Sequence, residues 1–197
     1  MILILDTLAK KPVFWLQTKN RVFTSSEIDT GIDDIEGCLK NIWEGAGLKP
    51  SELQMVAFNR GPGSFTGIKT GSVIAGSMAL FGAKLMSYTT FDWMQVLLGR
   101  PVENELLLLN AFQGDYFQAR RKNGVWDMKL GPFSDSEGSV CLYFGDKRFL
   151  KPQFVDLSPK EPVYLKELLK ENLLTNEVKP LYLKKSYAEI NREHCGE

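Results

Sequence analysis

Three features of this sequence have residue types or spacings that could support chemistry. Asp6-Thr7 follows the apolar run Ile2 to Leu5, so its carboxylate would stand at the tip of a buried strand, where it could hold the metal ion of a bound nucleotide. Ser64 follows the glycine-rich turn Arg60 to Gly63, and a serine at a sharp strand-to-helix turn can act as a nucleophile. The same turn opens a helix, whose first backbone N–H groups can bind a phosphate.

Each feature also has a simpler interpretation. Asp6 can cap the turn after its strand, and this alternative stays open beside the nucleotide site. A peptidase that uses Ser64 is disfavoured, because the only histidine, His194, is far away in the polar C-terminal stretch. A P-loop ATPase is disfavoured too, because the run Gly63 to Thr70 has its glycines too close together and an extra residue before its lysine.

A strand and a long helix must position the glycine-rich turn. Met55 to Phe58 predicts the buried strand, and the proline-free stretch Phe65 to Gly82 predicts the helix. Glycine costs about 1 kcal/mol against alanine in a helix, yet small residues recur here every four positions, on one side of the helix: Gly63, Gly67, Gly71, Ala75, Ala79 and Ala83. Missing side chains allow another backbone to approach closely. Two interpretations follow: a helix packed on its own sheet, or a helix presented to a second protein.

The composition is that of an ordinary globular protein. Hydrophobic residues make up 44% of the 197 residues, and 24 basic residues balance 24 acidic ones, so we expect no direct attraction to nucleic acid. One histidine excludes a histidine metal cluster, and we predict no metal site. Cys38, Cys141 and Cys195 are far apart, which favours free thiols and a cytoplasmic location. We expect neither a signal peptide nor a membrane span, because Asp6 ends the first apolar run early and no run approaches ~20 residues.

Strand and helix signals occur twice in a similar order. The apolar run Ile2 to Leu5 is followed by short strands with tight turns, and Glu105 to Leu109 is followed by a hairpin signal at Asn123-Gly124. We therefore predict an α/β protein with two related lobes, residues 1–98 and a smaller second lobe over residues 99–197. Two such lobes are typical of the actin-like, RNase H-like architecture.

Two motifs resemble a known family. Arg60-Gly61-Pro62-Gly63-Ser64-Phe65-Thr66-Gly67-Ile68-Lys69 closely resembles the GRGPGSFTGxR signature of the bacterial TsaB (YeaZ) family, and Pro180-Leu181-Tyr182-Leu183-Lys184 resembles its Pro-x-Tyr-Leu-Arg ending. The resemblance runs from Met1 to about Ala188 and is strongest in the first lobe. It implies the two-lobed fold of the actin-like ATPase (ASKHA) superfamily and an accessory role in the synthesis of threonylcarbamoyladenosine (t6A) on tRNA.

The resemblance also implies partners. In the family this helix region forms the dimer contact, with a second copy or with the catalytic paralogue TsaD, which favours the helix presented to a second protein. We therefore expect these residues to line the interface: Gly63, Phe65, Thr66, Gly67, Gly71, Ala75 and Ala79. With TsaD and the ATPase TsaE, the assembly would transfer a threonylcarbamoyl group to the adenosine beside the anticodon. The chain would reach tRNA only indirectly and need no cofactor of its own, with ATP at most at the partner junction.

The chain departs from the family pattern where an enzyme would need its ligands. Leu8 stands where serine is usual after Asp6-Thr7, and Ser25 to Gly31 lacks the usual His-Ser pair. Asn110-Ala111-Phe112 stands where the family has Asp-Ala-Arg, and a neutral amide binds a hard cation less well than a carboxylate. We therefore predict a non-catalytic subunit without catalytic residues.

Two alternatives remain. An independent ATPase or small-molecule kinase of the same fold would use Asp6 and Thr7 as nucleotide ligands. A homodimer with a function unrelated to tRNA would use the helix Phe65 to Gly82 for self-association only.

Overall fold

The computed structural model describes residues 1–8, 12–25, 35–111, 114–133, 140–144, 148, 150–157 and 167–183. The chain divides into two units. Unit 1 comprises Met1–Thr90 and Leu165–Leu181, and unit 2 comprises Phe91–Tyr164 and Tyr182–Glu197. This division differs from the predicted boundary between residues 98 and 99, because a helix and a late segment of the chain pack with the other unit.

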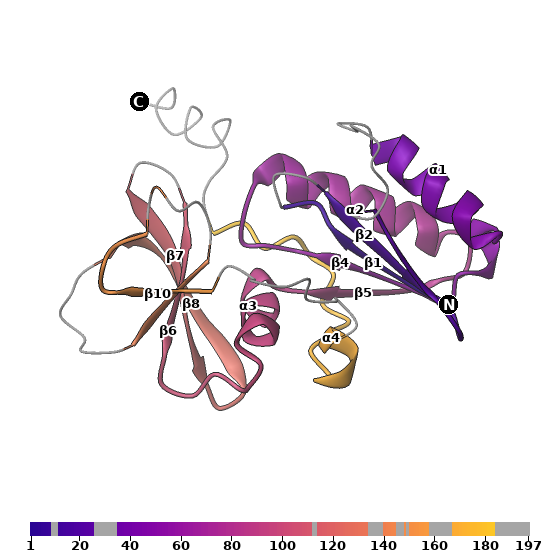
Figure 1. Ribbon diagram of the computed structural model, residues 1–197. Coiled ribbons are helices and arrows are strands. Elements are labelled where there is room, and N and C mark those ends of the chain that lie inside the picture. Colours follow the sequence, from indigo (N-terminus) through magenta and orange to yellow (C-terminus); the bar gives the residue numbers. More distant parts are fainter. Residues whose placement is uncertain are drawn as a thin grey trace, which may run out of the picture. The chain divides into compact units, whose positions relative to one another are not determined.

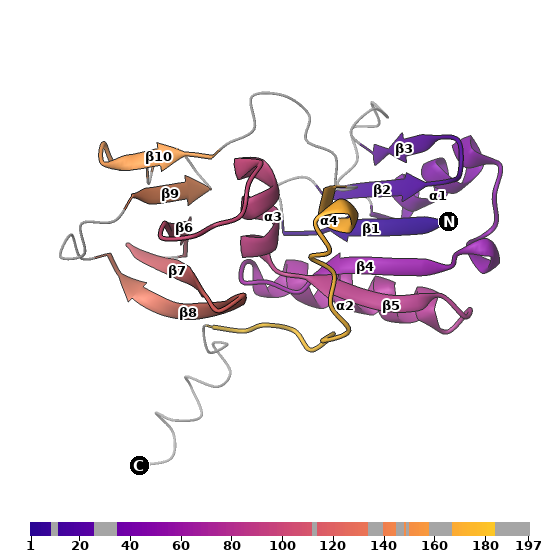
Figure 2. The ribbon, with the colours of Figure 1, turned by 90° about the horizontal axis from the view of Figure 1, so that it is seen from below.

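Unit 1 is built on a five-stranded mixed sheet of order β3-β2-β1-β4-β5 (Figures 1 and 2). The strands are β1 (Ile2–Asp6), β2 (Val13–Gln17), β3 (Val22–Thr24), β4 (Met55–Asn59) and β5 (Lys84–Tyr88). The first three strands form an antiparallel meander, and β4 and β5 continue the sheet in parallel with β1. The predicted strands Ile2 to Leu5 and Met55 to Phe58 are confirmed as β1 and β4.

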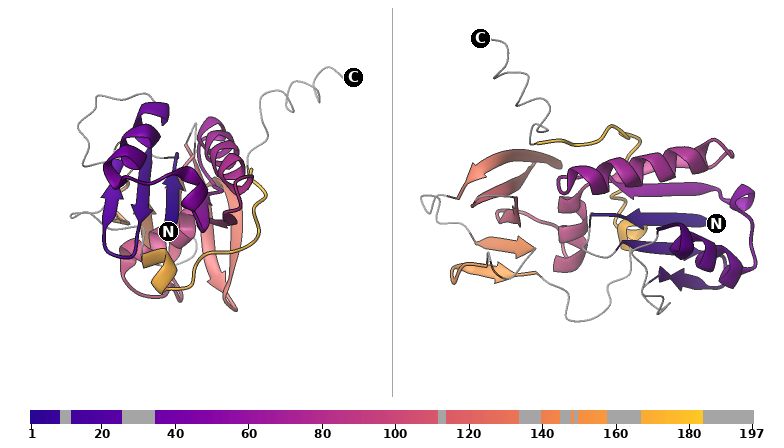
Figure 3. Two further views of the ribbon diagram at one scale, coloured as in Figure 1. Left: turned by 90° about the vertical axis from the view of Figure 1, so that its right-hand side faces the viewer. Right: turned by 90° about the horizontal axis from the view of Figure 1, so that it is seen from above.

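Two long helices cover one face of this sheet (Figures 1 and 3). They are α1 (Ile35–Ala46) and α2 (Phe65–Ala79), and a short 3-10 helix, η2 (Pro50–Glu52), precedes β4. Alternate strand residues point to this face and form the core with Ile42 of α1 and Ala75 of α2: Leu3, Leu5, Phe14, Leu16, Val56 and Phe58. The short helix α4 (Glu167–Lys170) lies on the opposite face (Figure 1).

Unit 2 repeats the same sheet plan. Its strands are β6 (Leu106–Asn110), β7 (Asp115–Lys122), β8 (Val125–Pro132), β9 (Cys141–Phe144) and β10 (Phe154–Asp156), in the order β10-β9-β6-β7-β8. The meander β6-β7-β8 is antiparallel, and β9 and β10 run parallel to β6. Each lobe therefore has three antiparallel strands followed by two parallel ones, which confirms the predicted α/β fold of two related lobes.

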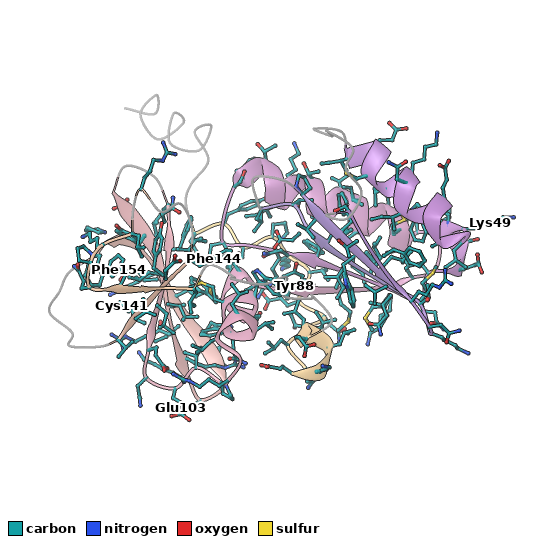
Figure 4. All side chains as sticks on the ribbon, viewed as in Figure 1. Lys49, Tyr88, Glu103, Cys141, Phe144 and Phe154 are labelled. Carbon is teal, nitrogen blue, oxygen red and sulfur yellow. The ribbon has the colours of Figure 1, made fainter. Side chains whose placement is uncertain are left out.

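Unit 2 contains two hydrophobic clusters, one on each side of its sheet. Helix α3 (Thr90–Leu98) contributes Phe91 and Met94 to the first cluster, with Leu107 and Phe117 from the sheet. These contacts explain why α3 belongs to unit 2. In the second cluster, Phe154 and Cys141, labelled in Figure 4, pack with Tyr116, Tyr143, Leu106 and Leu108.

Candidate functional site

The glycine-rich turn between β4 and α2 is fixed by buried polar side chains. Asn59 Oδ1 accepts hydrogen bonds from Gly61 N at 3.1 Å and Thr90 Oγ1 at 3.2 Å, and Thr90 N donates to Gly61 O at 2.9 Å. Gly61 has a φ of 110°, and a Cβ there would meet Leu181 O at 2.7 Å. Glycine is therefore required at this position for both conformation and space.

A segment from the C-terminal part of unit 1, residues 175–181, holds this turn in place. Thr175 pairs with Ser87 on the edge of β5, and Leu181 N donates to Arg60 O at 2.7 Å. The Arg60 guanidinium, 9% exposed, contacts Glu177 Oε2 at 3.0 Å and the Lys179 carbonyl at 3.3 Å. We call residues 175–181 the strap, because they cross the β5 edge and end on the turn that starts α2.

Ser64 caps the N-terminus of helix α2, where its side-chain oxygen accepts a hydrogen bond from Gly67 N at 3.3 Å. The Ser64 hydroxyl therefore has a structural role at the helix start.

The small-residue side of α2 packs on its own unit. Gly67, Gly71 and Ala75 are buried, and Thr7 Oγ1 donates to Gly67 O at 2.7 Å. A Cβ on Gly67 would overlap the Thr7 carbonyl oxygen, and one on Gly71 would lie 2.6 Å from Thr7 Oγ1. These three residues therefore cannot line a partner interface, which corrects that part of the prediction. The small residues are needed because the end of β1 approaches the helix so closely.

Gly63 and Ala79, at the two ends of the predicted stripe, are partly buried. A Cβ on Gly63 would lie 2.9 Å from Leu8 Cδ1, so this glycine also makes room for its own chain. The other two predicted interface residues, Phe65 and Thr66, are exposed. Of the predicted interface residues, only Phe65 and Thr66 at the start of the helix are therefore exposed.

The opposite side of α2 is exposed and largely apolar. Phe65, Val73 and Leu80 are 48%, 59% and 88% exposed, and Lys69 lies among them. A Cβ on Gly76 would have no atom within 4 Å. These five residues, which we call the outer face of α2, follow one another at helical spacing along one side. Val73 and Leu80 were not among the predicted interface residues, although apolar residues on both sides of a helix are a signal that could have included them.

Asp6 and Thr7 both have structural contacts. Asp6 Oδ1 accepts a hydrogen bond from Leu8 N at 2.9 Å, which caps the turn, and Asn59 Nδ2 lies 3.4 Å from Asp6 Oδ2. Tyr88, labelled in Figure 4, is buried nearby and donates to Leu5 O at 3.1 Å. Burial raises the pKa of Tyr88, and the charge of Asp6 raises that pKa further. A nucleotide role for Asp6 and Thr7 stays a prediction.

The matching strand end in unit 2 carries the expected amide. Asn110, at the end of β6, accepts a hydrogen bond from the Tyr143 hydroxyl at 3.2 Å. Three of the positions that depart from the family pattern lie outside the described residues. They are Phe112, Lys184 and residues 26–31, where the family has its His-Ser pair. Among the described residues, no group of three or more His, Cys, Asp or Glu side chains could hold a metal ion, and none of the helices there has the length and apolarity of a membrane span.

Comparisons with known proteins find two partial sequence matches. A family model described as TsaD, tRNA N6-adenosine threonylcarbamoyltransferase, matches residues 32–84, which include α1, the turn and α2. The protein of Escherichia coli K12 named tRNA threonylcarbamoyladenosine biosynthesis protein TsaB is 32% identical over 95 residues. That alignment covers 45% of this chain and 41% of the relative, so the matched region spans less than half of the relative's length.

Two solved structures share the fold over nearly the whole chain. A Pseudomonas aeruginosa protein described as uncharacterized, with similarity to peptidase YEAZ, has a TM-score of 0.62 at 15% identity, covering 93% of this chain and 99% of that one. YeaZ from Pseudomonas aeruginosa has a TM-score of 0.59 at 14% identity, covering 92% and 99%. These structures confirm the two-lobed actin-like, RNase H-like fold. The chain is therefore similar to YeaZ in fold, and to E. coli TsaB in part of its sequence.

Proposed function

We propose that this chain is a non-catalytic partner of TsaD in the synthesis of threonylcarbamoyladenosine on tRNA. The pathway is supported by the E. coli relative, whose name places it in this biosynthesis. The partner role is supported mainly by one observation, the outer face of α2. A helix that is apolar on both sides is normally buried on both sides, yet Phe65, Val73 and Leu80 on one side of α2 are exposed in the described part of the chain.

The outer face has the features of a docking surface. Contiguous exposed apolar side chains mark interaction sites on soluble proteins, and burying a side chain such as Val73 or Leu80 contributes about 1.5–3 kcal/mol. Gly76 lets a partner's backbone approach the middle of the helix, as its missing side chain leaves open space. Lys69 adds one positive charge, which favours a partner with an acidic residue at the facing position.

The proposed occupant of this face is TsaD. The segment that holds α1, the turn and α2 is also the segment matched by the TsaD family model, so TsaD contains a related helix pair. Two related helices can pack against each other about an approximate two-fold axis. A second copy of this chain would use the same surface when TsaD is absent, and the full assembly would include TsaE.

The chemistry is assigned to the partner. Thr7 and Asp6 are engaged in contacts to α2 and to the local turn, and Asn110 offers an amide where a carboxylate would bind a cation better. The chain carries no net charge, so tRNA is reached through the partner. We assign no cofactor to the chain itself, place any ATP at the partner junction, and expect the complex in the cytoplasm.

The pathway assignment is tested by depleting the protein and measuring tRNA nucleosides by mass spectrometry. The proposal predicts a loss of t6A that is restored by re-expression, whereas unchanged t6A would remove the assignment. Isothermal titration of the purified chain with Mg-ATP tests the enzyme alternative, which Asp6 at the tip of β1 motivates. The proposal predicts no turnover, and micromolar binding with turnover would favour an independent ATPase or kinase.

A further inference from the structure

The outer edge of the sheet in unit 2 is formed by a long strand. β8 is the last strand in the sheet order, and all eight of its residues pair with β7 on one side (Figure 2). No other strand in the described part of the chain pairs with its outer side. An edge strand of this length presents unpaired N–H and C=O groups that can pair with another strand.

The hairpin turn determines which residues present those groups. Asn123 and Gly124 have φ values of 51° and 79°, as in a two-residue type I′ turn, and Lys122 pairs with Val125 across it. Such a turn is closed by a hydrogen-bonded pair, and hydrogen-bonded residues then alternate along the strand. Val125, Asp127 and Lys129 therefore bond to β7, while the backbone groups of Trp126, Met128 and Leu130 point to the open edge.

The side chains of β8 alternate between the two faces of the sheet. Trp126, Met128 and Leu130 are partly buried and pack on the first hydrophobic cluster of unit 2. Val125, Asp127 and Lys129 are exposed on the other face. The strand therefore has one apolar side, one charged side, and an acidic and a basic residue on either side of Met128.

We propose that two copies of this chain pair through β8 as antiparallel strands, with the two-fold axis at Met128. In this register each Asp127 lies opposite Lys129 of the second copy, so both charged pairs are complementary. The outward backbone groups of the strands meet each other, and Trp126 faces Leu130 of the second copy on the apolar side.

Other registers lose this match. The outward backbone groups allow a two-fold axis at any residue from Trp126 to Leu130. An axis at Asp127 or Lys129 would place that residue opposite its own copy, so that like charges face each other. An axis at Trp126 would place Asp127 opposite Val125, and an axis at Leu130 would place Lys129 opposite Gly131. Charged residues on an edge normally discourage strand pairing, but opposite signs at these two positions favour one specific antiparallel pair. Asp127, which forms an ion pair with Lys122 at 2.5 Å, would then lie between two lysines.

The contact is expected to be weak, because one pair of edge strands buries less than the 1,200–2,000 Å² of a standard stable interface. It is separate from the proposed function, since β8 belongs to unit 2 and the outer face of α2 to unit 1. Self-association through α2 must be removed to measure it. The measurements are therefore made on Val73→Asp protein, by sedimentation velocity over a range of concentrations.

In that background we compare Asp127→Lys, Lys129→Asp and the double exchange. Each single substitution places like charges opposite each other twice per dimer, so the dimer is expected to weaken about tenfold. The double exchange restores both opposite-charge pairs and is expected to restore dimerisation. A chain that stays monomeric at all concentrations, single variants that dimerise as before, or a double variant that fails to recover would each overturn the proposal. Circular dichroism melting checks that all four proteins fold.

Discussion

Thr7 Oγ1 donates a 2.7 Å hydrogen bond to the carbonyl oxygen of Gly67, and this contact determines which side of α2 a partner can reach. It brings the end of β1 against the helix backbone, so the small residues of α2 serve the chain's own packing. The apolar residues on the other side of the helix stay exposed. Gly67 and Gly76 of the same helix therefore have opposite surroundings, since a Cβ on Gly67 would overlap the chain's own backbone and one on Gly76 would have open space.

Gly67→Ala is expected to lower the free energy of unfolding by about 1–3 kcal/mol, as overpacked positions do. The added Cβ would overlap the Thr7 carbonyl oxygen, a backbone atom that cannot swing away. Gly76→Ala is the matched control, since its Cβ meets nothing within 4 Å and alanine gains about 1 kcal/mol in a helix. Urea unfolding followed by circular dichroism measures both. Equal effects of the two substitutions would contradict the packing described for α2.

The attachment of the strap to the glycine-rich turn is expected to depend on the ion pair between Arg60 and Glu177. Glu177→Ala leaves the buried guanidinium without its carboxylate, so unfolding should become easier by about 1–3 kcal/mol. The amide of Leu181 should also exchange its hydrogen faster, because the strap is held less firmly to the turn. Lys179→Ala is the control, since Arg60 contacts only the main-chain carbonyl of Lys179. If the Leu181 amide of both variants exchanges its hydrogen at the rate of the unchanged protein, the ion pair does not hold the strap.

Glu105 should make stability depend on pH in the acid range. The hydrogen bond from Arg100 and the backbone amides of Glu103 and of Glu105 itself hold the pKa of Glu105 at about 2, below its ordinary value of 4.5. Between these two pKa values the unfolded chain binds more protons than the folded chain. The stabilisation by ionised Glu105 is therefore complete above pH 4.5 and is lost as the pH falls to about 2. Because Arg100 is half-exposed, solvent screens the pair, and we expect ionised Glu105 to add only about 1 kcal/mol to the free energy of unfolding.

The comparison for this prediction is Glu105→Gln, measured by urea unfolding at several pH values. The unchanged protein should be more stable than the variant at neutral pH, and the difference should vanish toward pH 2. A difference that stays constant across this range would show that the carboxylate charge makes no contribution.

The sequence predicted those parts of the fold that depend on local patterns. The apolar run of β1, the strand and turn before α2, and the Asn123-Gly124 hairpin are each encoded within a few neighbouring residues. The strap could not be predicted in this way, because Thr175 pairs with Ser87 across 88 positions of sequence. The lobe boundary differed for the same reason, since α3 is placed by Phe91 and its distant contacts in the sheet of unit 2.

The sequence predicted the close packing of α2 but not which side of the helix it would involve. A four-residue repeat from Gly67 to Ala75 indicates close backbone contact, but the repeat cannot tell whether the contacting backbone is the chain's own or a partner's. The structure answers this through Thr7, which precedes Gly67 by 60 positions. Exposure of Val73 and Leu80 became visible only once the buried side of α2 was known.

We propose that TsaD binds the outer face of α2, and the affinity of TsaD for Val73→Asp protein tests this binding most directly. A charge in the middle of an apolar interface should weaken binding at least about tenfold. Val155→Asp, at a valine of similar exposure in unit 2, is the matched control and should bind as the unchanged protein does. Isothermal titration with purified TsaD gives both values. Weakened binding for Val73→Asp alone is the predicted result, and unchanged binding by that variant, with its fold intact, would contradict the account.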